Sequence, residues 1–155
     1  MHEAAVYGTG LVVVATAVNL LHVVSHAGQG VVSLEAWQWA YVVGVIFFAP
    51  IVAAVLLWTP YRPVGAWLLL VSMAGSFVFD LAYHFLIPGP DNVSTLQPGA
   101  WLVPFRASAL LLVVASGAGS LVGGWAVGRS SRSRPRTPST VGAARYRRAP
   151  RTEAR

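Results

Sequence analysis

Residues 5–26 read AVYGTGLVVVATAVNLLHVVSH, an apolar run with one asparagine and two histidines in its second half. About 20 such residues, wound as an α-helix, cross the roughly 30 Å hydrocarbon layer of a bilayer. Three more runs of this kind follow, over about residues 37–58, 64–87 and 105–127. Since lipid tolerates no irregular backbone, the sequence predicts an all-α membrane protein, an antiparallel four-helix transmembrane bundle over residues 1–128.

Two features within the runs bear on how the helices pack. Pro50 lies in the middle of the second run, where it is expected to kink the helix. Gly119 and Gly123 form a Gly-x-x-x-Gly pattern in the fourth run. Small residues at this spacing let helix backbones approach closely, so the pattern predicts tight packing within the bundle or in a homo-oligomer or larger membrane complex.

The positive charge is concentrated at one end of the chain. The formal net charge is +6, yet only Arg62 and Arg106 precede Arg129. Residues 129–155 carry little that can be buried, so a disordered Arg-rich tail in contact with anionic lipid is expected. Arginine in short loops marks the cytoplasmic side, so Arg62 and the tail predict that both termini are cytoplasmic. The body lacks a basic face, which argues against nucleic-acid binding.

Composition also limits the chemistry. The chain has no cysteine, so thiolate metal sites and cysteine nucleophiles are excluded. Phosphate-binding loops and known hydrolase motifs are absent, which leaves catalytic residues, substrate and enzymatic activity undetermined. The arginine-only basic composition suggests a GC-rich prokaryotic genome and hence a multi-pass protein of the cell membrane.

Polar residues gather in the first and third runs. His22 and His26 are spaced i, i+4, as are Asp80 and His84, and this spacing places two side chains on one face of an α-helix. With both termini cytoplasmic, each pair falls in the outer leaflet at a similar depth. Ionisable residues inside a membrane are costly and usually functional. The pattern therefore predicts that the first and third helices are neighbours and that these four residues meet.

Three imidazoles and a carboxylate suit a transition metal. We expect His22, His26, Asp80 and His84 to bind Zn, Cu or Fe, with Asn19 as a hydrogen-bond partner to the ligands. One alternative is a haem b held by histidines on two helices. Another is a non-catalytic membrane subunit, in which Asp80 pairs with Arg106 and the polar cluster only fixes helix packing.

Overall fold

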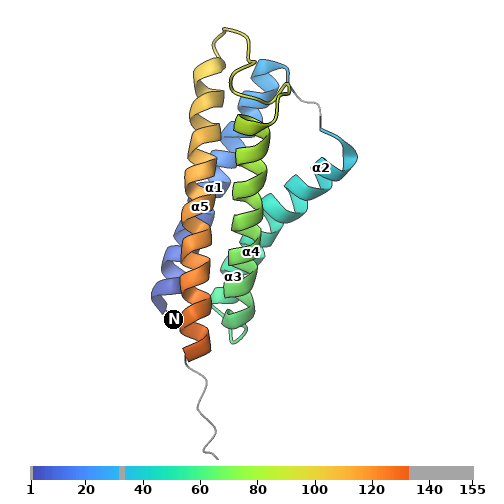
Figure 1. Ribbon diagram of the computed structural model, residues 1–155. Helices are drawn as coiled ribbons and strands as arrows, with labels where there is room; N and C mark the ends of the chain where they lie inside the picture. The colour runs from blue at the N-terminus through green and yellow to red at the C-terminus, as the bar shows by residue number, and fades with distance from the viewer. Residues whose placement is uncertain (1, 32–33, 133–155) are drawn as a thin grey trace, which may run out of the picture.

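The computed structural model describes residues 2–31 and 34–132, and every regular element in these ranges is a helix (Figure 1). In chain order they are α1 (His2–Gln29), α2 (Ala36–Tyr41), η1 (Val42–Phe48), α3 (Ala49–Leu57), α4 (Arg62–Leu81), η2 (Ala82–Leu86) and α5 (Leu102–Arg132). The two elements labelled η are π-helical turns. The described residues contain no strand.

These elements join into four helices long and apolar enough to cross a membrane, as the sequence predicts. They cover His2–Gln29, Ala36–Leu57, Arg62–Leu86 and Leu102–Ser131. The last is longer than expected, because α5 continues to Arg132 and so takes in the start of the predicted tail. Arg129 Nη1 donates to Glu3 Oε2 at 2.8 Å, which ties this end of α5 to the start of α1. The rest of the predicted tail lies outside the described residues.

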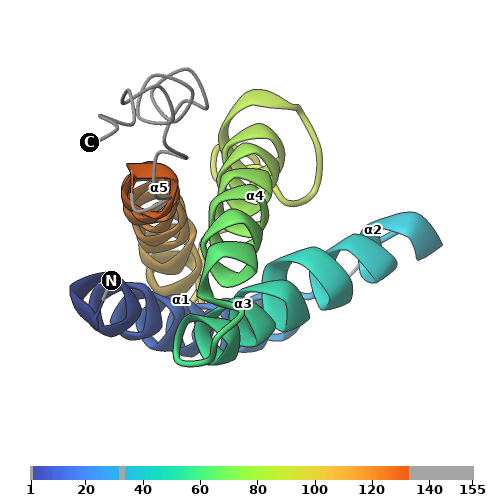
Figure 2. The same cartoon turned by 90° about the horizontal axis from the view of Figure 1, so that it is seen from below.

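Successive membrane spans run in opposite directions, so α1 begins at the end of the bundle where α5 ends (Figure 1). Each long helix packs against two others: α1 against α3 and α5, and α4 against α3 and α5 (Figure 2). The first and third spans therefore lie diagonally across the bundle. The expectation that they are side-by-side neighbours was wrong for their backbones, although their side chains do meet.

The apolar core occupies the end of the bundle where α1 begins and α5 ends. It is built largely from small residues, including Ala5, Ala53 and Ala126. An added Cβ at Gly123 would lie 2.7 Å from the backbone nitrogen of Leu70, so α5 approaches the backbone of α4 as closely as the glycine pattern predicts. This end of the bundle holds the four helices together.

The second span changes character at Pro50. Proline has no N–H to donate to the carbonyl one turn earlier, and the helix before it widens into η1, where Ala49 N–H donates to Gly44 O. Beyond this point α2 leans away from the other helices (Figures 1 and 2). The bundle is therefore open at the end opposite the apolar core.

Candidate metal centre

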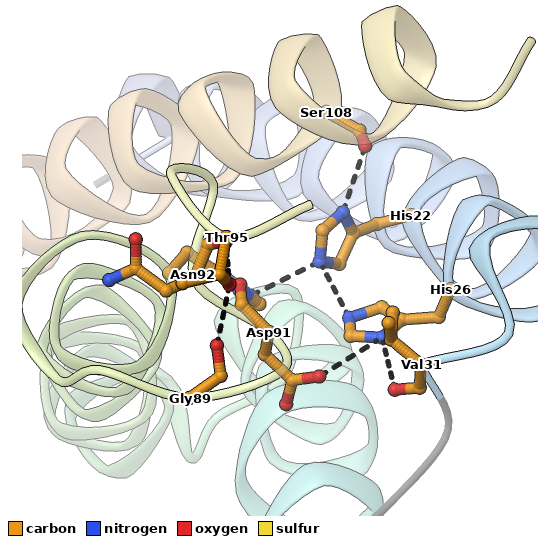
Figure 3. Close-up of polar contacts among 9 residues, drawn as sticks. His22, His26, Val31, Gly89, Asp91, Asn92, Thr95 and Ser108 are labelled. Carbon is orange, nitrogen blue, oxygen red and sulfur yellow. Dashed lines mark hydrogen bonds and ion pairs between the residues drawn. The ribbon is translucent and has the colours of Figure 1, made fainter. Parts of the chain in front are cut away.

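Three histidines, His22 and His26 of α1 and His84 of η2, converge inside the opened end of the bundle; Figure 3 labels the first two. His22 Nε2 lies 3.0 Å from His26 Nε2 and 3.1 Å from His84 Nε2. One ligand atom from each ring lies within 4.8 Å of the others, a spacing that a single metal ion can span. The imidazole of His22 therefore stands at the centre of the cluster, between its helix neighbour His26 and the diagonal His84.

The opposite nitrogen of each ring faces an oxygen atom (Figure 3). His84 Nδ1 lies 3.0 Å from the carbonyl oxygen of Asp91, and His26 Nδ1 lies 3.3 Å from the carbonyl oxygen of Val31. A carbonyl can only accept, so both Nδ1 atoms carry the proton. The Nε2 atoms of His26 and His84 consequently present lone pairs to the centre of the cluster.

His22 follows the same pattern through a serine. Its Nδ1 lies 2.8 Å from Ser108 Oγ, whose own hydroxyl reaches the carbonyl oxygen of Pro104 at 2.7 Å. When Ser108 donates to that carbonyl, its oxygen is free to accept from His22 Nδ1–H. All three Nε2 atoms then bear lone pairs, and the Nε2 atom of His22 lies 3.0 and 3.1 Å from those of His26 and His84. Converging lone pairs repel each other unless a proton or a cation lies between them.

Turns at the ends of the helices set these oxygen atoms in place. Gly30, with φ of +69°, ends α1 in the left-handed conformation that glycine adopts readily. Val31 N–H then donates to the carbonyl of His26 at 3.2 Å, and the carbonyl of Val31 faces the His26 ring. On the other side, Val93 N–H donates to the carbonyl of His84 at 3.0 Å, which holds the loop containing Asp91 over η2.

Phe105 seals the cluster on the side of α5. Its side chain is fully buried, and its ring centroid lies 4.7 Å from the rings of both His22 and His26 and 5.8 Å from that of His84. An aromatic ring against all three imidazoles excludes water from that face. A low-dielectric wall of this kind strengthens the interaction of the nitrogen atoms with any bound cation.

Asp91 adds a carboxylate at the edge of the cluster. Its Oδ1 lies 3.6 Å from His26 Nδ1, on the side of the ring away from the other histidines. Burial raises the pKa of the Asp91 carboxyl above its ordinary value, while the nearby His26 ring acts in the opposite direction. Carboxylates in this position orient ligand histidines in metal proteins and increase their basicity.

A cavity of about 290 Å³ adjoins the histidines. It lies between α1, the leaning α2–η1 segment and α4–η2, and most of its walls are apolar side chains such as Val42, Ile46 and Phe79. His22, His26 and His84 all contribute to its surface. The cluster thus has a closed face against Phe105 and an accessible face toward the cavity.

The other predicted site residues lie nearby but outside the cluster. Asp80 lines the cavity and does not belong to the group of converging ligand atoms. The predicted spacing assumed an α-helix, whereas η2 is π-helical, with Ile87 N–H donating to Ala82 O at 2.7 Å. The wider turn rotates His84 relative to Asp80. The two side chains therefore serve different parts of the site.

Asn19 and Arg106 do not take their expected roles. Asn19 lines the same cavity, but its Nδ2 donates to the carbonyl of Ala15 at 3.1 Å. Arg106 is exposed, and its Nε donates to the carbonyl of Val93 at 2.9 Å. Among the described residues, Asp80 and Arg106 form no ion pair. The alternative in which Arg106 neutralises Asp80 is therefore not what the structure shows.

Several contributors were missed from the sequence. Ser108, Phe105 and the carbonyl groups of Val31 and Asp91 carry no motif that marks them.

Comparisons with protein-family models, with curated proteins and with solved structures gave no match, so the chemistry of the site follows from its own geometry.

Proposed function

We propose that this multi-pass membrane protein binds one transition-metal ion through His22, His26 and His84, with an open coordination position toward the cavity. The observation that supports this most directly is the convergence of three Nε2 atoms whose rings are all oriented by oxygen acceptors. Three protein ligands and one open position are typical of catalytic rather than structural zinc sites. The reaction and the substrate are not specified by this arrangement.

Two of the three spacings between the nitrogen atoms, those from His22 Nε2, are close to the spacing in a metal-bound triad. Metal–nitrogen bonds of about 2.0–2.1 Å in tetrahedral geometry place the ligand nitrogens about 3.3 Å apart. The distances of 3.0 and 3.1 Å from His22 Nε2 need only small outward shifts to reach that value. Neutral imidazoles suit Zn, Cu and Fe alike, so the donor set does not distinguish them.

Haem b fits this arrangement less well than an ion. Two axial imidazoles on one iron would place their Nε2 atoms about 4 Å apart, at about 2 Å per bond. His22 Nε2 and His84 Nε2 are closer than that, and His26 Nε2 lies 3.0 Å from His22 Nε2, where the macrocycle would pass. A site of three histidines favours an ion.

A packing role without a metal is the second candidate. In that case Ser108 would donate to His22 Nδ1, and the proton on His22 Nε2 would be shared with the lone pairs of the other two rings. The cluster would then join α1 to η2 by hydrogen bonds alone. The two candidates differ in whether purified protein holds a stoichiometric ion.

The orientation of the site belongs to the same proposal. Arg62, the first residue of α4, favours the cytoplasm for that end of the bundle. The histidines lie at the opposite end, and so in the outer leaflet, open to metal from outside the cell. Contact of the tail with anionic lipid and assembly into a larger complex remain predictions.

The test is metal content after purification of the full chain in detergent. Wild-type protein exchanged into Co²⁺ should show the visible bands of a tetrahedral nitrogen-ligated ion, and one equivalent should remain after gel filtration. His22→Ala, His26→Ala and His84→Ala should each lose most of it. His2→Ala is the matched control, because His2 packs edge-on against Trp58 at the other end of the bundle. Wild-type protein that holds no Zn, Cu, Fe or Co would refute the proposal, and a Soret band would favour haem.

A further inference from the structure

Two carboxyl groups line the cavity beside the histidines: that of Asp91, whose Oδ1 lies 3.6 Å from His26 Nδ1, and that of Asp80, which has no such ion-pair contact among the described residues. Asp80 is 3% exposed and contributes to the lining, whereas most of the other lining residues are apolar. Its Oδ2 has no hydrogen-bond partner among the residues that the structure describes. Buried polar atoms without partners are rare in folded proteins and call for an explanation.

Leaving Asp80 unpartnered is costly. An unsatisfied buried polar group destabilises a protein by about 1–3 kcal/mol, and more when it is charged. Replacing it with an apolar side chain would remove that cost without opening a gap, so its presence indicates a function in the cavity. A molecule that enters the cavity with a hydrogen-bond donor would supply the missing partner.

The rim of the cavity faces the bilayer. Val23 on α1 and Trp39 on α2 both line it, and they are 47% and 46% exposed on the outer surface of the bundle. In a membrane these side chains meet lipid, so a ligand reaches the cavity sideways from the hydrocarbon layer. At about 290 Å³ the cavity lies at the low end of small-molecule sites, which span roughly 300–1,000 Å³.

We infer that the cavity binds a membrane-soluble amphiphile with a single hydroxyl head and an aliphatic tail. The hydroxyl donates to Asp80 Oδ2, the first part of the tail contacts Val42, Ile46 and Phe79, and the remainder lies in the bilayer. This assigns Asp80 to ligand recognition rather than to metal ligation.

The choice of a hydroxyl over an ammonium head rests on the proposed metal centre. A divalent ion on neutral imidazoles places positive charge on the same cavity, which disfavours a cationic ligand. A neutral hydroxyl avoids that repulsion and can still donate a hydrogen bond to the Asp80 carboxylate. Hydrogen bonding to Asp80 does not itself require the ion.

The experiment compares two fluorine-labelled probes with the protein in lipid nanodiscs. One is dodecanol with a terminal trifluoromethyl group, and the other is the matching dodecane without the hydroxyl. Fluorine NMR measures binding of each to metal-free and Zn²⁺-loaded protein, with protein-free nanodiscs correcting for partition into lipid. Wild-type protein should bind the alcohol at least about tenfold more tightly than the alkane, as expected for a hydrogen bond to a buried charged acceptor.

Two pairs of variants locate the effect. Asp80→Leu should bind the alkane as wild type does but lose the extra affinity for the alcohol, so that the ratio between the two probes falls to about one. Val42→Trp should abolish binding of both by filling the cavity, whereas Val43→Trp should not, because Val43 is exposed and does not line the cavity. Equal affinity of wild-type protein for the two probes overturns the inference. This is the result expected if water already supplies the hydrogen bond to Asp80. If wild-type protein binds no metal but still prefers the alcohol, the proposed metal centre is refuted and this inference stands.

Discussion

Ser108→Ala tests how the histidine cluster is held, without touching a ligand. The serine is completely buried on α5, and its oxygen is the contact of His22 Nδ1 at 2.8 Å. If His22 binds metal through Nε2, its Nδ1 must carry the proton and needs an acceptor. The substitution removes that acceptor and leaves only a methyl group facing the donor.

The expected change in metal affinity depends on whether the metal-bound or the metal-free protein loses a hydrogen bond. In the metal-bound protein the Nδ1–H of His22 has no other oxygen acceptor among the residues that the structure describes, so the unsatisfied donor costs about 1–3 kcal/mol. In the metal-free protein the proton can move to Nε2 and bond to His26 or His84, which are 3.0 and 3.1 Å away. The penalty therefore falls on the metal-bound state, and affinity should drop about 5- to 150-fold.

The assay is competition for Zn²⁺ between purified protein and a chelating dye. Ser116→Ala is the matched control, because Ser116 is also buried on α5 and also donates to a carbonyl one turn earlier, at 2.6 Å from Leu112 O. It should bind metal like wild-type protein. If Ser108→Ala binds Zn²⁺ as tightly as wild type, or if the two variants lose affinity equally, the assignment of the proton to His22 Nδ1 is incorrect.

Three further predictions concern pH, packing and orientation. Because burial raises the pKa of Asp91, its ionised form destabilises the fold, so wild-type protein without metal should lose thermal stability relative to Asp91→Asn as the pH rises above about 4. Gly123→Ala should destabilise the bundle by about 1–3 kcal/mol in a melting assay, since the new Cβ would meet the backbone of α4. In the same assay Gly124→Ala should be neutral or stabilising, because a Cβ at Gly124 would lie 3.9 Å from its nearest neighbour. A cysteine at Glu35 should react with an impermeant thiol reagent added to intact cells and one at Tyr61 should not; the reverse pattern contradicts the proposed orientation.

The four spans could be predicted because one physical requirement dominates them. A helix in lipid must be long and apolar, and both properties are visible in composition alone. The ends were less well predicted, since contacts such as Arg129 with Glu3 extend α5 past the apolar run. A kink at Pro50 was predicted, and the structure shows a π-helical segment just before this residue, which nothing in the sequence indicates.

The site was predicted in part for a similar reason. His22 and His26 lie on a regular α-helix, where the i, i+4 rule holds, and they do converge. Asp80 and His84 are separated by the start of η2, where the rule fails, so the predicted fourth ligand became a cavity residue. Ser108 and Phe105 reach the cluster through tertiary packing, which a spacing argument along one helix does not capture.

The diagonal placement of α1 and α4 gives a bound ion a mechanical role. Neighbouring helices in this bundle pack against each other directly, whereas near the open end the two diagonal spans are joined by the rings of His22 and His84, whose centroids are 4.6 Å apart. An ion shared by these rings acts as a removable crosslink between them. Loading or stripping the metal would then change the stiffness of one end of the bundle, while the alanine-rich end stays the same.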